Sequence, residues 1–145
     1  MKALLQRVTH AEVHVDGICV GAIGPGLLVL LGLDKDDSLQ NGQRLIDKLL
    51  AYRLFADSEG RMNQSVVERK GGVLLVSQFT LSADTRRGLR PSFSSALAPD
   101  DAQALFARLY DYLSMQHQPT ACGQFGADMQ VSLINDGPVT FLLEA

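Results

Sequence analysis

The segment Gly26–Leu33 (GLLVLLGL) constrains the fold more than any other, because it is the most apolar run in the chain. Glycine and proline at positions 24–26 break the chain where it begins. A short apolar run bounded by such residues is typical of a buried strand. The run is also far shorter than the roughly 20 residues that a membrane-spanning helix needs. The sequence therefore predicts a buried strand here and a soluble protein.

Strand patterns lie on both sides of this segment and near the end of the chain. Alternating apolar residues indicate a strand over 2–15, and Asp16-Gly17 has the turn chemistry of a hairpin. Two last strands are expected over 128–135 and 139–143, with Asp136-Gly137-Pro138 as the bend between them. The return strand of the first hairpin carries apolar residues at alternate positions: Ile18, Val20 and Ala22.

Two other segments have helical spacing. Ser38 is the expected N-cap of a helix that extends to about Leu54, and Pro99 opens a second helix. Residues 82–98 form a long loop, a kind of segment that is often functional in a small domain. These patterns predict one α+β domain over 1–145, with two principal helices and a mainly antiparallel, barrel-like core. The apolar face of the second helix consists of Ala102, Leu105, Phe106, Leu109 and Leu113.

The composition argues against several classes of protein, among them disordered, DNA-binding and secreted ones. A chain of 145 residues with 46% hydrophobic and 20% charged residues supports one compact core and is not disordered. Its formal net charge of −3 does not attract nucleic acid, so DNA binding is not expected and any RNA contact must come from a local basic patch. The N-terminus lacks the apolar region of a signal peptide, which predicts a cytoplasmic protein.

The cysteines and histidines predict neither a metal nor another cofactor. Cys19 and Cys122 form no CxxC motif or Cys/His cluster, so both are expected as small apolar residues in or near the core. His10 and His14 are four apart in a predicted strand, where they share a face but stand well separated. A solvated face is the expected environment of this pair.

Ser77–Leu81 (SQFTL) is the first segment whose residues could take part in catalysis. The apolar residues 73–76 read as a buried strand that leads directly into it. Backbone N–H groups at a strand end suit an oxyanion hole, and Thr80 or Ser77 offers a hydroxyl nucleophile. The segment contains no base to activate that hydroxyl, and an ordinary strand end with Phe79 and Leu81 packed inward is the alternative.

Two further segments combine unusual residues. Asn135–Thr140 (NDGPVT) has strong turn chemistry, which a hairpin bend explains in full. The segment from 86 to 93 is a basic cluster with an aromatic residue beside it. Guanidinium groups bind phosphates and an aromatic ring stacks on a base, although a solvated charged loop explains the cluster equally well. Its candidates for contact with a phosphate or a base, and so for contact with tRNA if the resemblance described next holds, are Arg86, Arg87, Arg90 and Phe93.

Together these segments resemble the D-aminoacyl-tRNA deacylases over essentially the entire chain. SQFTL and NxGPVT are the signature motifs of that family, and both occur here without a mismatch. Details between them differ, as at Ser82 and Leu89, outside the signature positions. The matching segments are LLQRVTHAEVHVDG (4–17), GAIGPGLLVLLGL (21–33), YRLFADSEGRMNQSV (52–66), VSQFTLSADTRRGLRPSF (76–93) and FGADMQVSLINDGPVT (125–140).

The resemblance implies a homodimeric ester hydrolase with its active sites at the interface. Members of the family release a D-amino acid from the 3′ end of tRNA. By resemblance, Gly137 and Pro138 form a cis pair that enters the partner's site, where their carbonyl groups exclude an L side chain. Such rejection also predicts hydrolysis of glycyl-tRNA, because glycine has no side chain to collide. The resemblance further places Arg7 beside the pair and Met129 in the same wall.

Catalysis is expected at Ser77, Gln78, Phe79 and Thr80, and two mechanisms remain open. In the first, Thr80 is the nucleophile of an acyl-enzyme. In the second, the segment supplies backbone oxyanion donors while the 2′-hydroxyl of the terminal adenosine helps to activate water. The absence of a base beside Thr80 favours the second mechanism.

Two other classes of function remain as alternatives. A small-molecule esterase would use Thr80 or Ser77, although the chain has no Ser/His/Asp pattern. A dimeric binding module would use the Gly-Pro turn as an interface element only, without hydrolysis.

Overall fold

The computed structural model describes residues 1–86 and 88–145. Arg87, one of the residues predicted to contact tRNA, lies outside the described residues. The elements are β1 (Lys2–Val15), β2 (Ile18–Ile23), β3 (Gly26–Gly32), α1 (Leu39–Ala51), β4 (Phe55–Ala56), β5 (Met62–Gln64), β6 (Gly72–Ser77), the 3₁₀ helix η1 (Phe79–Ser82), α2 (Pro99–Gln116), β7 (Thr120–Cys122) and β8 (Gln130–Glu144).

The long strand β1 organises the main sheet. One edge of β1 pairs with β3 through residues 2–8 and with β2 through residues 11–15. β8 runs antiparallel along its other edge. β6 and β7 continue the sheet beyond β3, and the contacts between β2 and β7 bring its two ends together into a nearly closed barrel.

The pairing is mainly antiparallel, as predicted, but two pairs of strands are parallel. β1 pairs antiparallel with β2, β3 and β8, but β3 with β6 and β6 with β7 are parallel. The reason is the position of the helices: α1 lies in the connection from β3 to β6, and α2 in that from β6 to β7. Helical crossovers of this kind return the chain in the same direction.

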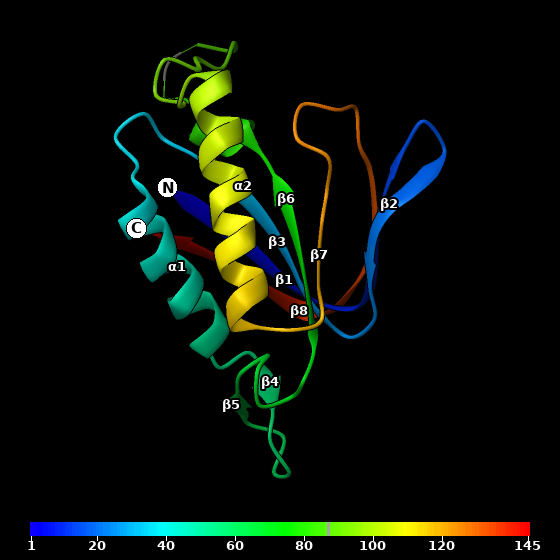
Figure 1. The fold of residues 1–145 in the computed structure, drawn as a ribbon. Helices are drawn as coiled ribbons and strands as arrows, with labels where there is room; N and C mark the ends of the chain where they lie inside the picture. The colour runs from blue at the N-terminus through cyan, green and yellow to red at the C-terminus, as the bar shows by residue number, and fades with distance from the viewer. Residues whose placement is uncertain (87) are drawn as a thin grey trace.

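The sheet separates two hydrophobic cores. The helix-side core packs α1 and α2, which lie side by side in Figure 1, against residues such as Leu5 and Leu75. The barrel core fills the other face of the sheet and includes Val13, Leu28 and Leu74. The two cores together bury β3 on both faces, which confirms the strand predicted from its apolar run.

Both predicted helices are present. The Ser38 side chain accepts a hydrogen bond from the backbone N–H of Asn41, and the Asn41 side chain bonds back to Ser38, so the N-cap is a complete capping box. α1 ends at Ala51, three residues before the expected end. The five predicted apolar residues of α2 are all buried. Among the described residues, neither helix is apolar and long enough to cross a membrane.

The predicted bend at Asp136-Gly137-Pro138 is wrong. β8 is continuous, and both of its halves pair with β1. Five residue steps of β8, from Asn135 to Thr140, oppose only two steps of β1, from Gln6 to Val8. The excess residues bulge out of the strand, so the turn-forming sequence produces a bulge and not a hairpin.

The prediction for Cys19 is also wrong. Cys19 is exposed, whereas Cys122 is half-buried. Ile18 and Val20 are likewise exposed, to 69% and 39%. For Cys19 the physical reason is a β-bulge in the hairpin: the pairing of β1 with β2 slips by one residue between Val13 and His14, so that Cys19 lies opposite His14 instead of Val15.

Candidate functional site

The end of β6 leads into η1 and leaves two backbone donors free. The Gln78 N–H donates to the Leu31 carbonyl at 2.8 Å and so ends the pairing of β6 with β3. In the described part of the chain, the N–H groups of Phe79 and Thr80 donate to no protein group, and no side chain caps η1. Free N–H groups at a helix start stabilise a developing negative charge.

The Thr80 hydroxyl has a donor beside it instead of a base. Its Oγ1 accepts a hydrogen bond from the Gln78 Nε2 at 2.6 Å. An amide donor cannot remove the hydroxyl proton, and activation of a nucleophile requires a group that can. Thr80 itself is exposed. The local geometry therefore favours backbone donors over a threonine nucleophile.

A cleft of about 680 Å³ opens beside this segment. Five of the predicted site residues meet in its lining: Ser77, Gln78, Phe79, Phe93 and Met129. The remaining lining is largely apolar and comes from the end of β6, the start of α2 and the segment before β8. These further residues are Val76, Ala96, Leu97, Ala98, Pro99, Ala102, Phe125, Gly126, Ala127, Asp128 and Val131.

Two aromatic rings stand together in this lining. The ring centroids of Phe79 and Phe93 are 5.0 Å apart, and the ring planes are tilted by 54°. Their side chains are 60% and 42% exposed, so Phe79 does not pack inward as the alternative reading of the strand end required. Exposed aromatic faces beside a cleft are suited to stacking on a nucleobase.

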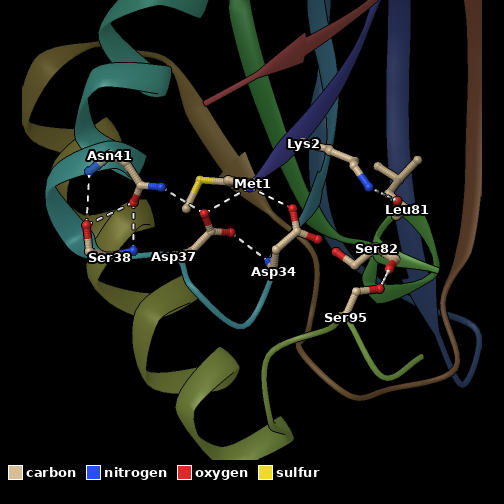
Figure 2. A network of polar contacts seen from close by, with 9 residues as sticks. All are labelled: Met1, Lys2, Asp34, Asp37, Ser38, Asn41, Leu81, Ser82 and Ser95. Atoms are coloured by element: carbon tan, nitrogen blue, oxygen red, sulfur yellow. Dashed lines mark hydrogen bonds and ion pairs between the residues drawn. The ribbon is translucent and has the colours of Figure 1, made fainter. Parts of the chain in front are cut away.

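Polar contacts from Lys2 and Ser95 hold η1 in place, as Figure 2 shows. The Lys2 Nζ donates to the Leu81 carbonyl at 3.2 Å, and the Ser95 hydroxyl donates to the Ser82 carbonyl. The Met1 ammonium donates to Asp34 at 2.8 Å and to Asp37 at 2.9 Å. Desolvation alone would lower the pKa of this ammonium, but its hydrogen bonds to the two carboxylates raise it overall.

Gly32 allows η1 to approach β3 closely. A Cβ at this position would lie 2.8 Å from the Leu81 Cβ and 3.1 Å from the Gln78 carbonyl oxygen. The first contact is shorter than real Cβ contacts, and the second is tighter than most of them and is to backbone, which cannot easily move aside. Glycine at this position therefore lets η1 keep its place on the sheet.

From the resemblance to the deacylases we expect Gly32→Ala to reduce deacylation by about 100-fold, since a displacement of about 1 Å in a catalytic group has effects of that size. Single-turnover deacylation rates measure the loss. The matched control is Gly72→Ala, because a Cβ there also meets a packed neighbour, the Ile23 side chain, but at the opposite end of β6 from η1. Equal losses of activity in the two variants would contradict a specific role of Gly32.

The bulge of β8 forms a second group of predicted site residues. The Arg7 Nε donates to the Asp136 carbonyl at 2.9 Å, and its Nη1 donates to the Leu54 carbonyl at 2.6 Å. The Asn135 Nδ2 donates to the carbonyls of Arg7 and Val139 at 2.9 and 3.0 Å. Side chains of Arg7 and Asn135 thus bind the bulge at both of its ends.

The tip of the bulge lies apart from the cleft of its own chain. Gly137 and Pro138 are exposed, and the peptide bond between them is cis. Neither residue lines the cleft, nor does Arg7. This chain therefore brings Met129 to the segment 77–79 but leaves the Gly-Pro pair outside that cleft.

The arginines of the basic cluster at 86–93 are only partly available to bind an anion. The Arg86 guanidinium donates to both carboxylate oxygens of Asp84, at 2.9 and 2.7 Å, and holds the pKa of that carboxyl well below its usual range. Arg90 is exposed. Neither arginine lines the cleft, whereas Phe93 does.

Sequence reasoning missed several residues of this site. Asp128 is the charged residue of the described cleft lining, and it stands directly before Met129 in the matched ADMQ segment. The start of α2 lines the cleft through Ala98, Pro99 and Ala102, which carry no functional group that could have marked them. Asn135 belongs to the motif NDGPVT, but its hydrogen bonds to two carbonyl groups depend on the bulge, which the sequence pattern does not indicate.

Known proteins resemble this chain over its full length. The family described as D-Tyr-tRNA(Tyr) deacylase matches residues 4–144. Curated D-aminoacyl-tRNA deacylases of Azotobacter vinelandii and Stutzerimonas stutzeri are 59% and 57% identical to it over 145 residues, which is 100% of each chain.

Solved structures share the fold. A c-Myc DNA Unwinding Element Binding Protein has a TM-score of 0.95 and 38% sequence identity, and the match covers 100% of this chain and 99% of that one. A probable eukaryotic D-amino acid tRNA deacylase has a TM-score of 0.86 at 17% identity, over 98% of this chain and 97% of the other.

Proposed function

This chain belongs to the D-Tyr-tRNA(Tyr) deacylase family and is a hydrolase of ester bonds, and on that premise we propose how it edits aminoacyl-tRNA. Its substrate is the ester between a D-amino acid and the 3′ end of tRNA, and its products are the free tRNA and the D-amino acid. The observation that carries this proposal is the position of Ser77–Phe79 in the lining of a large cleft, with the N–H groups of Phe79 and of the next residue, Thr80, bonded to no described protein group. Side-by-side incubation with D- and L-tyrosyl-tRNA tests it.

In the proposed mechanism, the ester carbonyl points toward the start of η1. When water attacks, the N–H groups of Phe79 and Thr80 stabilise the oxyanion of the tetrahedral intermediate. The 2′-hydroxyl of the terminal adenosine assists in activating the water. The terminal base stacks near Phe79 and Phe93, whose rings are exposed at the cleft. The steps of this proposal require no cofactor.

Thr80→Ala separates the two mechanisms that the sequence leaves open. The substitution removes the hydroxyl but keeps the backbone N–H, so we expect deacylation within about threefold of the wild-type rate. Single-turnover kinetics on D-tyrosyl-tRNA measure this rate. A threonine nucleophile would instead make the loss several orders of magnitude, on the order of the 10⁴–10⁶-fold seen when a catalytic nucleophile is removed.

Selection of the D configuration is assigned to the bulge of β8. We propose that the carbonyl groups of Gly137 and Pro138 form a wall in the partner's cleft. An L side chain collides with this wall, while a D side chain points away from it. Arg7 and Asn135 support this role because three hydrogen bonds of their side chains to carbonyl groups fix the bulge, while a fourth holds Arg7 to the Leu54 carbonyl, and the tip of the bulge stays exposed. Rejection of this kind works by exclusion and recognises no particular D side chain.

A homodimer supplies the wall. Leu142 lies opposite Leu4 in the sheet, and Leu4 lies opposite Leu30. Leu142 is 52% exposed and the other two are half-buried, so the sheet carries an apolar row that no element of the same chain covers fully. A second copy that packs on this row also brings its bulge toward the cleft. Two-fold symmetry then completes both sites at once.

Glycyl-tRNA follows as a second substrate. Glycine has no side chain that the wall can exclude, so rejection by shape alone cannot distinguish it from a D-residue. We therefore propose that the enzyme also hydrolyses mischarged glycyl-tRNA.

Contacts to the rest of the tRNA are few in this proposal. Arg90 is the exposed candidate for a phosphate, and Arg86 contributes only where a phosphate competes with Asp84. Arg87 stays a prediction from the sequence. A net charge of −3 fits an enzyme that holds only the acceptor end and works in the cytoplasm, without binding DNA or a membrane.

A further inference from the structure

Three metal-ligating side chains of different types meet on the β1–β2 hairpin, away from the cleft. They are Glu12, His14 and Cys19, and one ligand atom from each lies within 4.8 Å of the others. His14 Nδ1 is 3.9 Å from a carboxylate oxygen of Glu12. We propose that these three side chains form a binding site for a divalent transition-metal ion, with Zn²⁺ as the best-matched ion.

The bulge in the hairpin creates this cluster. Val13 pairs with Gly21, but the next residue, His14, pairs with Cys19, so Val20 is the extra residue of β2. Without the slip, His14 would face Val20, and Cys19 would point to the opposite side of the hairpin. The bulge therefore brings the thiol to the face of Glu12 and His14. Bulges recur where a strand must redirect a side chain for function.

The donor set matches zinc. A thiolate and a carboxylate neutralise a divalent cation, and the neutral imidazole adds a third ligand without charge. Ligand distances of about 2.0–2.3 Å in a tetrahedral site place donor atoms roughly 3.5 Å apart, so small side-chain rotations of Glu12 and Cys19 suffice. Sulfur and imidazole ligands disfavour Mg²⁺ and Ca²⁺, which prefer oxygen.

The ligands are also available. In the described part of the chain, the side chains of Glu12 and His14 make no hydrogen bond, and the Cys19 thiol makes only a long contact of 3.7 Å to the Gly21 carbonyl. All three residues are at least partly exposed. They lie on the outer face of the barrel, opposite the side on which Val13 enters the barrel core.

Binding proceeds as a proton exchange. The Cys19 thiol releases its proton to solvent as the metal–sulfur bond forms, while Glu12 is already a carboxylate and His14 binds as neutral imidazole. Water occupies the fourth position, because three protein ligands leave one open. None of the three residues lines the cleft of the described chain.

Metal titration of the purified, metal-free enzyme tests this site. Zn²⁺ is added in competition with a chromophoric chelator, and Co²⁺ in a separate titration reports a thiolate ligand through its charge-transfer absorption. We expect one ion per chain and a thiolate band. Cys19→Ser and His14→Gln should each weaken binding by at least about 10-fold, since even loss of an indirect partner of a metal site costs 10–100-fold.

Two matched variants control for adventitious binding. Cys122→Ser removes the other cysteine, and His10→Gln removes a histidine of the same strand outside the cluster. Both should retain wild-type affinity. Binding that survives in the triple variant of Glu12, His14 and Cys19, a Co²⁺ spectrum without a thiolate band, or equal losses in the controls would each overturn the proposal. Protection of Cys19 from alkylation by Zn²⁺ provides an independent measurement on the unaltered enzyme.

Discussion

Gly137→Ala should abolish most of the D-tyrosyl-tRNA deacylase activity while the protein stays folded. A Cβ at this position would collide with the Asn135 Oδ1 and lie 2.6 Å from the Val139 backbone nitrogen. Asn135 cannot move away without losing its bonds to the Arg7 and Val139 carbonyls. The bulge must therefore shift, and a shift of about 1 Å corresponds to a loss of roughly 100-fold in rate.

Gly24→Ala is the matched control for this variant. Gly24 is exposed, and a Cβ there meets nothing within 4 Å, so its activity should stay at the wild-type level. Thermal unfolding of both variants checks that the fold is retained, because Gly137 is itself exposed and its substitution opens no cavity in either core. A Gly137→Ala enzyme with full activity and full discrimination against L-tyrosyl-tRNA would exclude the wall.

Mixed dimers test whether the wall comes from the partner. One chain carries Gly32→Ala, with an impaired cleft and an intact bulge, and the other carries Gly137→Ala, with an intact cleft and an impaired bulge. Co-expression with two affinity tags yields the mixture. We expect about a quarter of the wild-type activity, because half of randomly formed dimers are mixed and each has one complete site of two.

A bulge that served the cleft of its own chain would give the mixture a different activity. If each bulge served the cleft of its own chain, no chain in the mixture would hold a complete site, and activity would remain at the level of the separate variants. Isolation of the doubly tagged dimer raises the expected value to about half of the wild-type activity. Wild-type chains with the same two tags control for the effect of tagging.

The fold was predictable wherever local sequence determines local structure. Ser38 and Pro99 marked the starts of both helices, and the apolar run before Leu33 marked the central strand. Asp16 and Gly17 marked a turn, and both residues have positive φ in the structure. In each of these cases the signal lies within a few residues of the feature that it predicts.

The misread features depend on pairing between distant segments. Whether Asp136-Gly137-Pro138 forms a bend or a bulge is decided by β1, which pairs with β8 on both sides of it. The exposure of Cys19 is likewise decided by a register slip against His14. Periodicity within one strand contains no information on the register of its partner.

The candidate site was predictable only in part for a related reason. Ser77–Thr80 and Met129 carried family motifs, and the structure brings residues of both segments to one cleft. The apolar lining from α2 and the support of η1 by Lys2 and Ser95 come from packing, which leaves no pattern in a single sequence. Arg7 and Gly137 carried motifs as well, but their proposed function lies in a second chain.

One measurement tests the central claim most directly. The purified enzyme is incubated with D-tyrosyl-tRNA, L-tyrosyl-tRNA and glycyl-tRNA in parallel, and the release of each amino acid is followed over time. We expect rapid release of D-tyrosine and of glycine, while L-tyrosyl-tRNA decays only at the rate of a control without enzyme. Release of L-tyrosine at a rate comparable to that of D-tyrosine, or no release from any substrate, would contradict the account.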